Sequence, residues 1–218
     1  MTRRLFAEGL GALLLATAVI GSGIMAERLA DGNAAVALLA NTGATVAALA
    51  VLIALFGPTS GAHFNPVITL VATTKGSLTV GEAAGYIAVQ VLGCCLGAML
   101  ANAMFELPLV QFSTQARTGA AQWLSEVIAT AGLVLVAFTA PSVKEAAWRV
   151  PAWIGAAYWF TASTSFANPA ITLGRTLTDT FAGIRPIDSA GFILAQIGGG
   201  LLGLLAARIL PPARSETL

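Results

Sequence analysis

Two stretches of the chain nearly repeat one another, and each contains an Asn-Pro pair inside an apolar region. The first is His63–Leu70 and the second is Ser165–Leu173, and both contain the pattern Asn-Pro-x-Ile-Thr-Leu. Asn is a preferred helix N-cap, and Pro suits the first helical position because its φ is already set and it has no N–H to leave unpaired. Each pair therefore predicts a helix start. An ordinary capped helix would explain one such pair, but two matching copies amid apolar segments indicate a duplicated structural element.

The composition is that of an integral membrane protein. Of 218 residues, 57% are hydrophobic and only 10% are charged, which is more apolar surface than a soluble domain needs for its core. We therefore expect the lipid bilayer to surround the chain. A formal net charge of +1 and the lack of a Lys/Arg run argue against nucleic acid as a partner.

The cysteines and the histidine give no sign of a metal or a cofactor. Cys94 and Cys95, the only cysteines, are neighbours in an apolar run, so on a helix their side chains point about 100° apart. They are interpreted as small packing residues and not as a disulfide framework or a metal cluster. His63 has no cluster of cysteines or carboxylates beside it. We expect no cofactor, no metal and no enzymatic activity, because no nucleophile, base and orienting group occur together.

Six apolar segments are long enough to span a bilayer, which takes about 20 helical residues. The first follows Arg3 and Arg4, as the apolar part of a signal peptide does. It is interpreted as a membrane span because its apolar run is long and contains Glu8. The expected spans are residues 5–25, 35–56, 82–104, 123–140, 148–164 and 187–210.

The two Asn-Pro boxes lie in segments that are too short to cross. The first box is followed by only about ten residues of helical character before Lys75 and Gly76, half of what a crossing needs. The second short helix is expected to reach Asp179. Both are predicted to be re-entrant half-helices. Residues 1–218 are thus predicted to form one all-α membrane domain with six transmembrane helices and two half-helices.

The two halves of the chain follow the same order of elements: span, span, half-helix and span. Glu8 in the first span corresponds to Glu126 in the fourth, and Gln90 in the third corresponds to Gln196 in the sixth. Because three crossings per half reverse the direction of the second copy, the halves are predicted to be inverted repeats related by a pseudo-twofold axis in the membrane plane. Their approximate bounds are residues 1–105 and 119–211.

The charges of the loops predict the orientation. With the N-terminus inside, seven Lys and Arg residues face the cytoplasm and four face outside, so the positive-inside rule favours a cytoplasmic N-terminus. Six crossings place the C-terminus on the same side. The expected location is a bacterial-type inner (plasma) membrane.

Together the two boxes predict a pore. Non-helical backbone at membrane depth is tolerated only where it is buried in protein or lines a water-filled cavity. If the half-helices meet with their N-termini near the midplane, their positive dipole ends repel cations, and the amides of Asn65 and Asn168 donate hydrogen bonds to what passes. Backbone carbonyls of residues 61–64 and 164–167 offer acceptors. We therefore expect a selective passive pore for uncharged polar solutes.

The two boxes resemble the paired signature boxes of the aquaporin, or major intrinsic protein (MIP), family. The resemblance covers nearly the whole chain. It implies the aquaporin fold, a passive channel and a homotetramer with one pore per subunit. The first box has valine where the family usually has alanine. The box residues are Asn65, Pro66, Val67, Asn168, Pro169 and Ala170.

The same resemblance implies a selectivity filter at the outer end of the pore, and here the chain departs from the family. Ile171 directly follows the second box, where family members typically carry an arginine. The other filter positions, carried over by their spacing from the boxes, are Thr45, Ala156 and Ser165. No aromatic ring or charge remains among these four residues. A wide, weakly polar filter is therefore expected, which would pass glycerol-like solutes as well as water.

Residues 165–184 are similar to a bacterial branch of the family that is associated with arsenic-resistance operons. This resemblance implies arsenous acid or methylated arsenicals as further solutes. Arsenous acid is uncharged at neutral pH and resembles glycerol in its hydroxyl groups, so it would fit a wide filter. The expected solutes are therefore water, glycerol-like molecules and arsenicals.

Four ionisable residues leave alternatives open. Glu8 and Glu126 lie inside spans, where a carboxylate is by default functional. They either couple a secondary transporter to protons or, as the family resemblance implies, accept hydrogen bonds from the re-entrant loops. His63 either lines the cytoplasmic vestibule or caps loop backbone. Arg175 either points toward the outer rim near Asp179 or turns back to replace the missing filter arginine.

Overall fold

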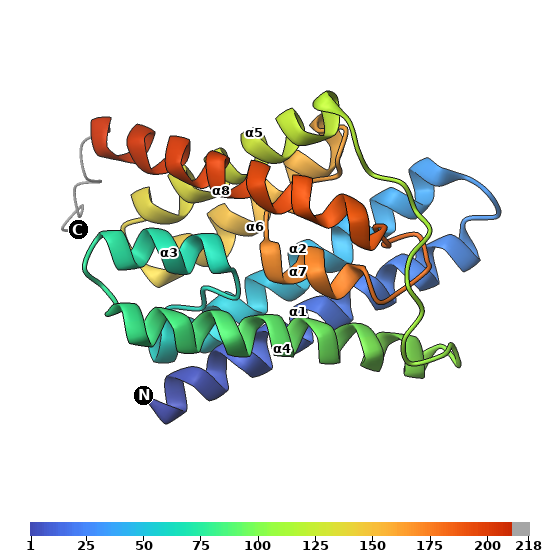
Figure 1. The fold of residues 1–218 in the computed structure, drawn as a ribbon, viewed down its shortest axis with the longest axis horizontal. Helices are drawn as coiled ribbons and strands as arrows, with labels where there is room; N and C mark the ends of the chain where they lie inside the picture. The colour runs from blue at the N-terminus through green and yellow to red at the C-terminus, as the bar shows by residue number, and fades with distance from the viewer. Residues whose placement is uncertain (211–218) are drawn as a thin grey trace.

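A computed structural model describes residues 1–210 of the chain, and these residues form six long helices and two short ones without a strand (Figure 1). The short helices follow the two Asn-Pro pairs, and the predicted all-α architecture of six long helices and two half-helices is confirmed. The helices are α1 (Thr2–Leu29), α2 (Ala34–Ser60), α3 (Pro66–Thr74), α4 (Val80–Met104), α5 (Ala120–Thr139), α6 (Val143–Phe160), α7 (Pro169–Arg175) and α8 (Pro186–Ile209).

Five of the six long helices are long and apolar enough to cross a membrane. The exception is α6, which has 18 residues and carries Lys144, Glu145 and Arg149 near its start. Arg149 and Glu145 form an ion pair of 2.8 Å there. Despite this polar start, α6 packs beside α2 and α5 within the bundle.

The end of α2 is later than the sequence predicts. The Gly57-Pro58 pair predicts a break, but the helix continues to Ser60 with Pro58 in its last turns. It ends where Gly61 takes a left-handed φ of 91°, which a glycine adopts without a Cβ penalty. The Gly61 N–H still donates to the Gly57 carbonyl at 3.0 Å. This ending turns the chain into the loop before α3.

The start of α6 also differs from the prediction. The helix begins at Val143 and not near residue 148, because the Ser142 hydroxyl accepts a hydrogen bond from the Glu145 N–H at 3.2 Å and caps it. Pro151 therefore lies inside α6 and not in its first turn.

The second half-helix, α7, ends at Arg175, four residues before the predicted end. The Thr176 carbonyl accepts a hydrogen bond from the Ser113 N–H at 3.0 Å. The Leu177 carbonyl accepts one from the Gln111 N–H at 3.2 Å. The long segment between α4 and α5, residues 105–119, thus pairs with the chain after α7 and replaces further helical hydrogen bonds. We call this segment the linker.

Glycines bring two pairs of helices into backbone contact. A Cβ at Gly93 or Gly97 of α4 would lie 2.4 or 2.3 Å from carbonyl oxygens of α1. A Cβ at Gly199 or Gly203 of α8 would likewise lie 2.4 or 2.3 Å from carbonyl oxygens of α5. Only residues without a side chain permit this approach, and such small residues are typical of helix contacts in membranes.

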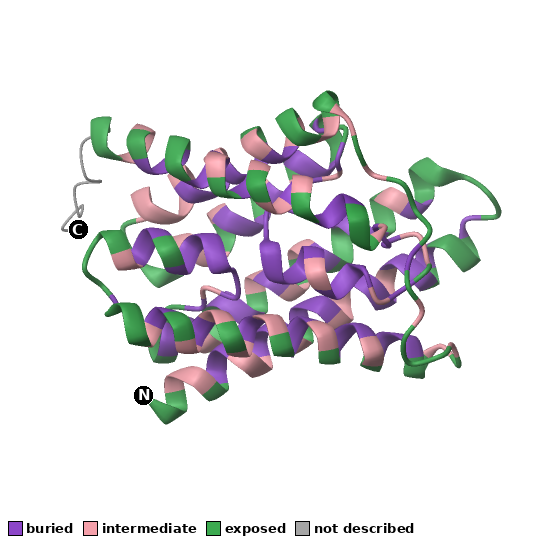
Figure 2. Ribbon diagram, viewed as in Figure 1, coloured by how far each residue is buried: buried purple, intermediate pink, exposed green. Residues whose placement is uncertain are grey.

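The half-helices lie inside the bundle, and the long helices expose apolar surface outward. Figure 2 shows α3 and α7 as largely buried, whereas the outward faces of the long helices are exposed. A continuous apolar exterior of this kind suits contact with lipid. The chain is therefore a multi-pass membrane protein. Exposed apolar side chains include Leu55 of α2, Leu100 of α4, Leu124 of α5 and Leu201 of α8.

The contact between α5 and α8 predicts different effects of alanine at two adjacent glycines. Gly199→Ala should lower the melting temperature in detergent, because its Cβ would lie 2.4 Å from the Val127 carbonyl oxygen, and overpacking costs about 1–3 kcal/mol. Gly198→Ala should leave the melting temperature unchanged or slightly higher, because nothing lies within 4 Å of that Cβ. Equal melting temperatures for the two variants would contradict this packing.

Candidate functional site

Each Asn-Pro pair begins a half-helix, as the sequence predicts. The Asn65 side-chain oxygen accepts a hydrogen bond from the Val67 N–H at 2.9 Å and caps α3. The Asn168 oxygen accepts from the N–H groups of Ala170 and Ile171 at 3.0 and 3.3 Å and caps α7. In both helices proline occupies the first turn. Each cap uses the oxygen of the amide, which leaves the amide nitrogen for other contacts.

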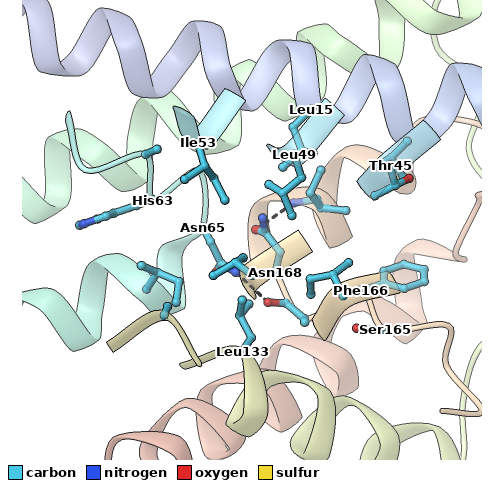
Figure 3. Close-up of a pocket in the computed structure, with 18 of the residues that line it drawn as sticks. Leu15, Thr45, Leu49, Ile53, His63, Asn65, Leu133, Ser165, Phe166 and Asn168 are labelled. Carbon is cyan, nitrogen blue, oxygen red and sulfur yellow. Dashed lines mark hydrogen bonds between the residues drawn. The ribbon is translucent and has the colours of Figure 1, made fainter. Parts of the chain in front are cut away.

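The two half-helices meet at their N-terminal ends. The Asn65 amide nitrogen donates to the Ala167 carbonyl at 2.7 Å, and the Asn168 amide nitrogen donates to the Phe64 carbonyl at 2.8 Å. Each bond links one box to the backbone just before the other box. Figure 3 shows the two asparagines close together in the middle of a cavity. Each amide nitrogen carries two hydrogens, so each can make one further hydrogen bond.

Both loops hold non-glycine residues in the left-handed backbone conformation. Ala62 and Phe64 have φ values of 50° and 47°, and Ser165 and Ala167 have φ values of 51° and 48°. In each loop one of these residues lies three positions before the asparagine, and the other lies directly before it. A residue with a Cβ adopts this conformation at a cost of about 1–3 kcal/mol and keeps it only where its surroundings hold it.

Glu8 of α1 provides such a hold for the first loop. Its carboxylate is fully buried. Every partner is a donor, and two of the partners are backbone N–H groups of the left-handed stretch, so the buried charge is satisfied and the loop is fixed. The partners are the Ser60 hydroxyl at 2.7 Å, the His63 N–H at 2.9 Å, the Phe64 N–H at 2.8 Å and the Gln90 amide at 2.7 Å.

Glu126 of α5 holds the second loop in the same way. It is fully buried and also accepts four hydrogen bonds. The four partners of Glu126 match those of Glu8. In each half they are a hydroxyl before the loop, two loop N–H groups and a glutamine from the last helix of that half. For Glu126 they are the Ser163 hydroxyl at 2.6 Å, the Phe166 N–H at 2.9 Å, the Ala167 N–H at 2.8 Å and the Gln196 amide at 2.7 Å.

Both asparagines line a cavity of about 190 Å³. Figure 3 shows His63 and Ile53 toward one end and Thr45 and Ser165 toward the other, with the asparagines between them. We call these the His63 end and the Thr45 end. Since one water needs about 10–15 Å³ of such space, the cavity has room for a file of waters or for a small solute.

Most residues that the sequence predicts to face a pore line this cavity. The remaining box residues are buried but do not line it, so they pack the half-helices in place. The lining residues are Thr45, His63, Asn65, Ser165, Asn168 and Ile171. The packed box residues are Pro66, Val67, Pro169 and Ala170.

The predicted filter position at Ala156 is wrong. Ala156 is exposed and does not line the cavity, whereas Ile154 and Tyr158 do. Each of these two residues is two positions from Ala156, a rotation of about 200° on a helix, so Ala156 faces away. The position carried over by spacing fails because a spacing along the chain does not fix the rotation of α6 about its axis.

The cavity also has an aromatic ring and a charge at the Thr45 end, where the sequence predicts neither. Tyr158 donates to the Thr45 hydroxyl at 3.4 Å, and Phe166 and Arg175 are part of the wall. Arg175 is only 3% exposed and does not lie at a rim beside Asp179, whose carboxylate accepts hydrogen bonds from the linker. Of the two alternatives left open for Arg175, the structure thus contradicts the outer rim and favours a position in the cavity wall.

Helical spacing is the signal that could have identified these residues. Arg175 follows Ile171 by four positions, so both lie on one face of α7. Val150, Ile154 and Tyr158 recur at the same interval and line the cavity from one face of α6. The pattern is informative only once one residue of each helix is known to face the cavity.

Of the two interpretations that the sequence leaves open for His63, the structure favours the one in which it faces the cavity, since its ring pairs with a side chain of α3 and not with loop backbone. His63 lines the cavity, and its Nδ1 lies 3.1 Å from the Thr69 hydroxyl of α3. Its ring packs against Tyr86, with the ring centroids 5.4 Å apart. Within residues 1–210, no three His, Cys, Asp or Glu side chains are placed to hold a metal ion.

Six long helices around two half-helices that meet inside a cavity define the class of aquaporin-like membrane channels. A model of the major intrinsic protein family matches residues 1–163 of the chain. The chain is also 50% identical over 217 residues to the protein named aquaglyceroporin AqpS from Rhizobium meliloti (strain 1021), a match that covers 98% of this chain and 93% of the relative. The chain therefore belongs to the major intrinsic protein family.

More distant relatives agree with this assignment. The probable glycerol uptake facilitator protein of Thermotoga maritima is 28% identical over 90% of this chain and 94% of its own length. Aquaporin TIP1-1 of Zea mays is 28% identical over 92% and 84%. The solved structure of the aquaglyceroporin from Plasmodium falciparum shares the fold, with a TM-score of 0.69, 17% identity and 97% coverage of both chains. The predicted aquaporin fold is confirmed, and family membership makes the chain a channel protein and not an enzyme.

Glu126 should be more sensitive to removal than to neutralisation. In Glu126→Ala four buried donors lose their acceptor, and each unpaired group costs about 1–3 kcal/mol. Glu126→Gln keeps one oxygen, which can serve two of the donors, so its melting temperature in detergent should fall less. Glu145→Gln, at the partly exposed start of α6, is the control and should change stability by less than about 1 kcal/mol. Similar melting temperatures for the three variants would show that the buried carboxylate does not hold the loop.

Proposed function

We propose that the chain is a passive channel for small uncharged polar solutes and that the cavity is the central part of its pore. The observation that carries this proposal is the crossed pair of hydrogen bonds in which the amides of Asn65 and Asn168 reach the opposite loops. Each bond uses one hydrogen of its amide and leaves one for a solute in the cavity. A hydroxylated molecule thus finds two donors at the middle of the path.

The same arrangement opposes cations. The backbone N–H ends of α3 and α7 lie at the two asparagines, and a helix N-terminus carries roughly half a positive charge. A cation that lost its hydration shell would meet two such ends and two amide donors, with little to replace its water ligands. A neutral solute exchanges hydrogen bonds with water for hydrogen bonds with the amides and with loop carbonyls.

We assign a holding role, and not proton coupling, to Glu8 and Glu126. Each carboxylate accepts four hydrogen bonds from fixed donors. Protonation of either carboxylate would place an O–H group opposite a donor and break one of these hydrogen bonds. The alternative, a proton-coupled secondary transporter of a small solute, requires a carboxylate that gains and loses a proton in each cycle. The four hydrogen bonds therefore favour a channel.

We further propose that the Thr45 end is the selectivity filter. Its wall is formed by Thr45, Tyr158, Ser165 and Ile171, with Tyr158 in the place that the sequence assigns to Ala156. Three hydroxyl groups offer hydrogen bonds to a hydroxylated solute, and the isoleucine adds an apolar side. A wall of this kind suits a small polyol.

Water and glycerol-like molecules are the solutes proposed first, because a relative of 50% identity is named an aquaglyceroporin and a more distant one a probable glycerol uptake facilitator. Arsenous acid or methylated arsenicals are proposed as further solutes. Arsenous acid has three hydroxyl groups and no charge at neutral pH, so it offers the filter the same chemistry as glycerol. The similarity of residues 165–184 to the branch associated with arsenic-resistance operons supports this part of the proposal.

The chain is proposed to lie in a bacterial-type inner (plasma) membrane with its N-terminus in the cytoplasm. In this orientation α1 crosses outward and α2 returns, so the His63 end is the cytoplasmic vestibule and the Thr45 end opens outward. A homotetramer with one pore per subunit is proposed from the family resemblance. The C-terminal tail, expected in the cytoplasm, lies outside the described residues.

The two halves, residues 1–105 and 119–211, are proposed to be inverted repeats. Support comes from the matched surroundings of the two buried carboxylates and from the matched glycine contacts between α1 and α4 and between α5 and α8. In both loops the left-handed residues also stand at the same distance from the asparagine. Residue 211 lies outside the described part of the chain.

A panel of solutes on the purified protein in liposomes tests the proposed channel. Stopped-flow light scattering should show permeation of water, glycerol and arsenous acid that does not respond to an imposed proton gradient. Asn168→Asp keeps the oxygen that caps α7 but puts a negative charge between the two helix starts, so it should lower glycerol flux and admit cations. Uptake that follows the proton gradient in the wild type would establish the transporter instead.

Ile171 tests the proposed filter. Ile171→Arg places a charged, longer side chain in the cavity wall and should reduce permeation of glycerol and arsenous acid more than that of water. Ile171→Val is the matched control and should leave the ratio of glycerol to water permeability nearly unchanged. The ratio is measured in the same liposomes, which corrects for the amount of folded protein. A constant ratio in Ile171→Arg would place the filter elsewhere.

A further inference from the structure

Arg175 is a buried cation at the Thr45 end of the cavity. Its side chain is the last of α7 and is 3% exposed, and it belongs to the cavity wall. The guanidinium lies over the Phe166 ring, with its carbon 3.4 Å from the ring centroid. Its Nε donates to the Ala182 carbonyl. These two contacts fix the plane of the guanidinium and leave its two terminal nitrogens without a hydrogen-bond partner among residues 1–210.

A second arginine lies on the same aromatic ring. The guanidinium carbon of Arg117, from the linker, is 5.2 Å from the Phe166 centroid. Its side chain donates to the carbonyls of Gly183 and Phe181 at 2.8 and 3.1 Å. Carbonyl oxygens satisfy its hydrogens but do not balance its charge. Phe166 therefore has two cationic groups beside it.

The carboxylates around this pair do not neutralise it. Among residues 1–210 the ion pairs are Arg4 with Glu82, Arg149 with Glu145 and Arg185 with Asp188. Glu126 is the carboxylate whose field reaches both Arg117 and Arg175, and its oxygens are already occupied by four donors of the second loop. The Thr45 end thus carries an excess of positive charge, with Arg175 buried and Arg117 half-buried.

Ser165 adds an unpartnered donor at the same end. Its hydroxyl is buried, lines the cavity and has no hydrogen-bond partner among residues 1–210. A buried hydroxyl and a buried guanidinium each lose hydration that must be replaced, and the loss is largest for the charged group. The Ser165 hydroxyl and the charged Arg175 guanidinium therefore favour an acceptor that carries a negative charge.

Resting on the proposed channel, we propose that the Thr45 end binds a small monovalent oxyanion of carboxylate geometry, held by Arg175 and Ser165. The two terminal nitrogens of a guanidinium match the two oxygens of a carboxylate, which makes such pairs short and directional. The Ser165 hydroxyl donates to one of the same oxygens. The Phe166 ring behind the guanidinium keeps water from its other face.

The bound anion stands in the path of the neutral solutes. The Thr45 end forms one end of the cavity that leads to Asn65 and Asn168, so an anion held there blocks the passage of glycerol while it stays. The site therefore makes the flux of a neutral solute depend on the concentration of a small organic acid in its ionised form. This is a selectivity property that the four filter residues do not have by themselves.

Formate and formamide are matched probes, because they have nearly the same shape and only formate is charged at neutral pH. Each is placed at equal concentration on both sides of liposomes that contain the full chain, and glycerol efflux is measured by stopped-flow light scattering. Formate at a concentration equal to its Kd should lower glycerol permeability about twofold, whereas formamide should not. In detergent, formate but not formamide should raise the melting temperature, because a ligand that binds only the folded state stabilises it.

Arg175→Gln should abolish both responses to formate. Arg185→Gln is the matched control, because Arg185 is paired with Asp188 and does not line the cavity, and it should respond as the wild type does. Ser165→Ala keeps the charge and the Phe166 contact and should weaken the formate response several-fold. If Arg175→Gln fails to fold, the formate response of Ser165→Ala tests the proposed site.

The proposal is overturned if formate changes neither the flux nor the melting temperature of the wild type up to roughly 0.1 M, a concentration that would saturate even a millimolar site. It is also overturned if Arg175→Gln or Ser165→Ala responds as the wild type does. Melting reports the site whether or not glycerol passes. A wild type that passes no glycerol but melts higher in formate would thus refute the proposed solute and retain the anion site.

Discussion

A buried carboxylate that accepts four hydrogen bonds holds each re-entrant loop, and the position of the loop backbone that meets Asn65 and Asn168 depends on it. In the second loop, Glu126 binds the N–H groups of Phe166 and Ala167, next to residues in the left-handed conformation. Without this acceptor the backbone would not remain in so costly a shape. The shape in turn presents the Ala167 carbonyl to Asn65. Secondary structure, buried charge and pore geometry are thus linked through one side chain in each half.

The duplicated scaffold carries different chemistry at the two ends of the cavity. Seven positions after the asparagine, α7 has Arg175, whereas α3 has the small buried residue Ala72. The loop before α3 contributes His63, and the corresponding position of the second loop is Phe166. One end is therefore lined by an imidazole and the other by a guanidinium stacked on a phenyl ring. The internal symmetry builds the path, and the residues that break it make the ends of the path different.

The sequence alone predicts the scaffold well, because local chemistry determines it. Asn65 and Asn168 each start a helix for reasons contained in two adjacent residues, and the matched glutamates follow from the repeat. The filter is harder, because it depends on helix rotation, and a shift of two residues moves Ala156 from the cavity to the exterior. Spacing from a distant box does not fix that rotation. The position of Arg175 raises the same difficulty, because its spacing from Ile171 places it on the cavity side of α7 only once Ile171 is known to line the cavity.

The linker connects the two halves, and its later part, residues 111–117, is hydrogen-bonded to the second half. Besides its contacts with Thr176 and Leu177, its Arg117 N–H donates to Asp188 at the start of α8, and its Gln115 carbonyl accepts from the Arg185 N–H. The linker thus packs beside the segment between α7 and α8. During synthesis, the hydrogen bonds of linker residues 111–117 cannot form until some sixty later residues have been added to the chain. The surroundings of α7 are therefore completed late and include a stretch from the middle of the chain, so the two halves are not separable building blocks even though they share one plan.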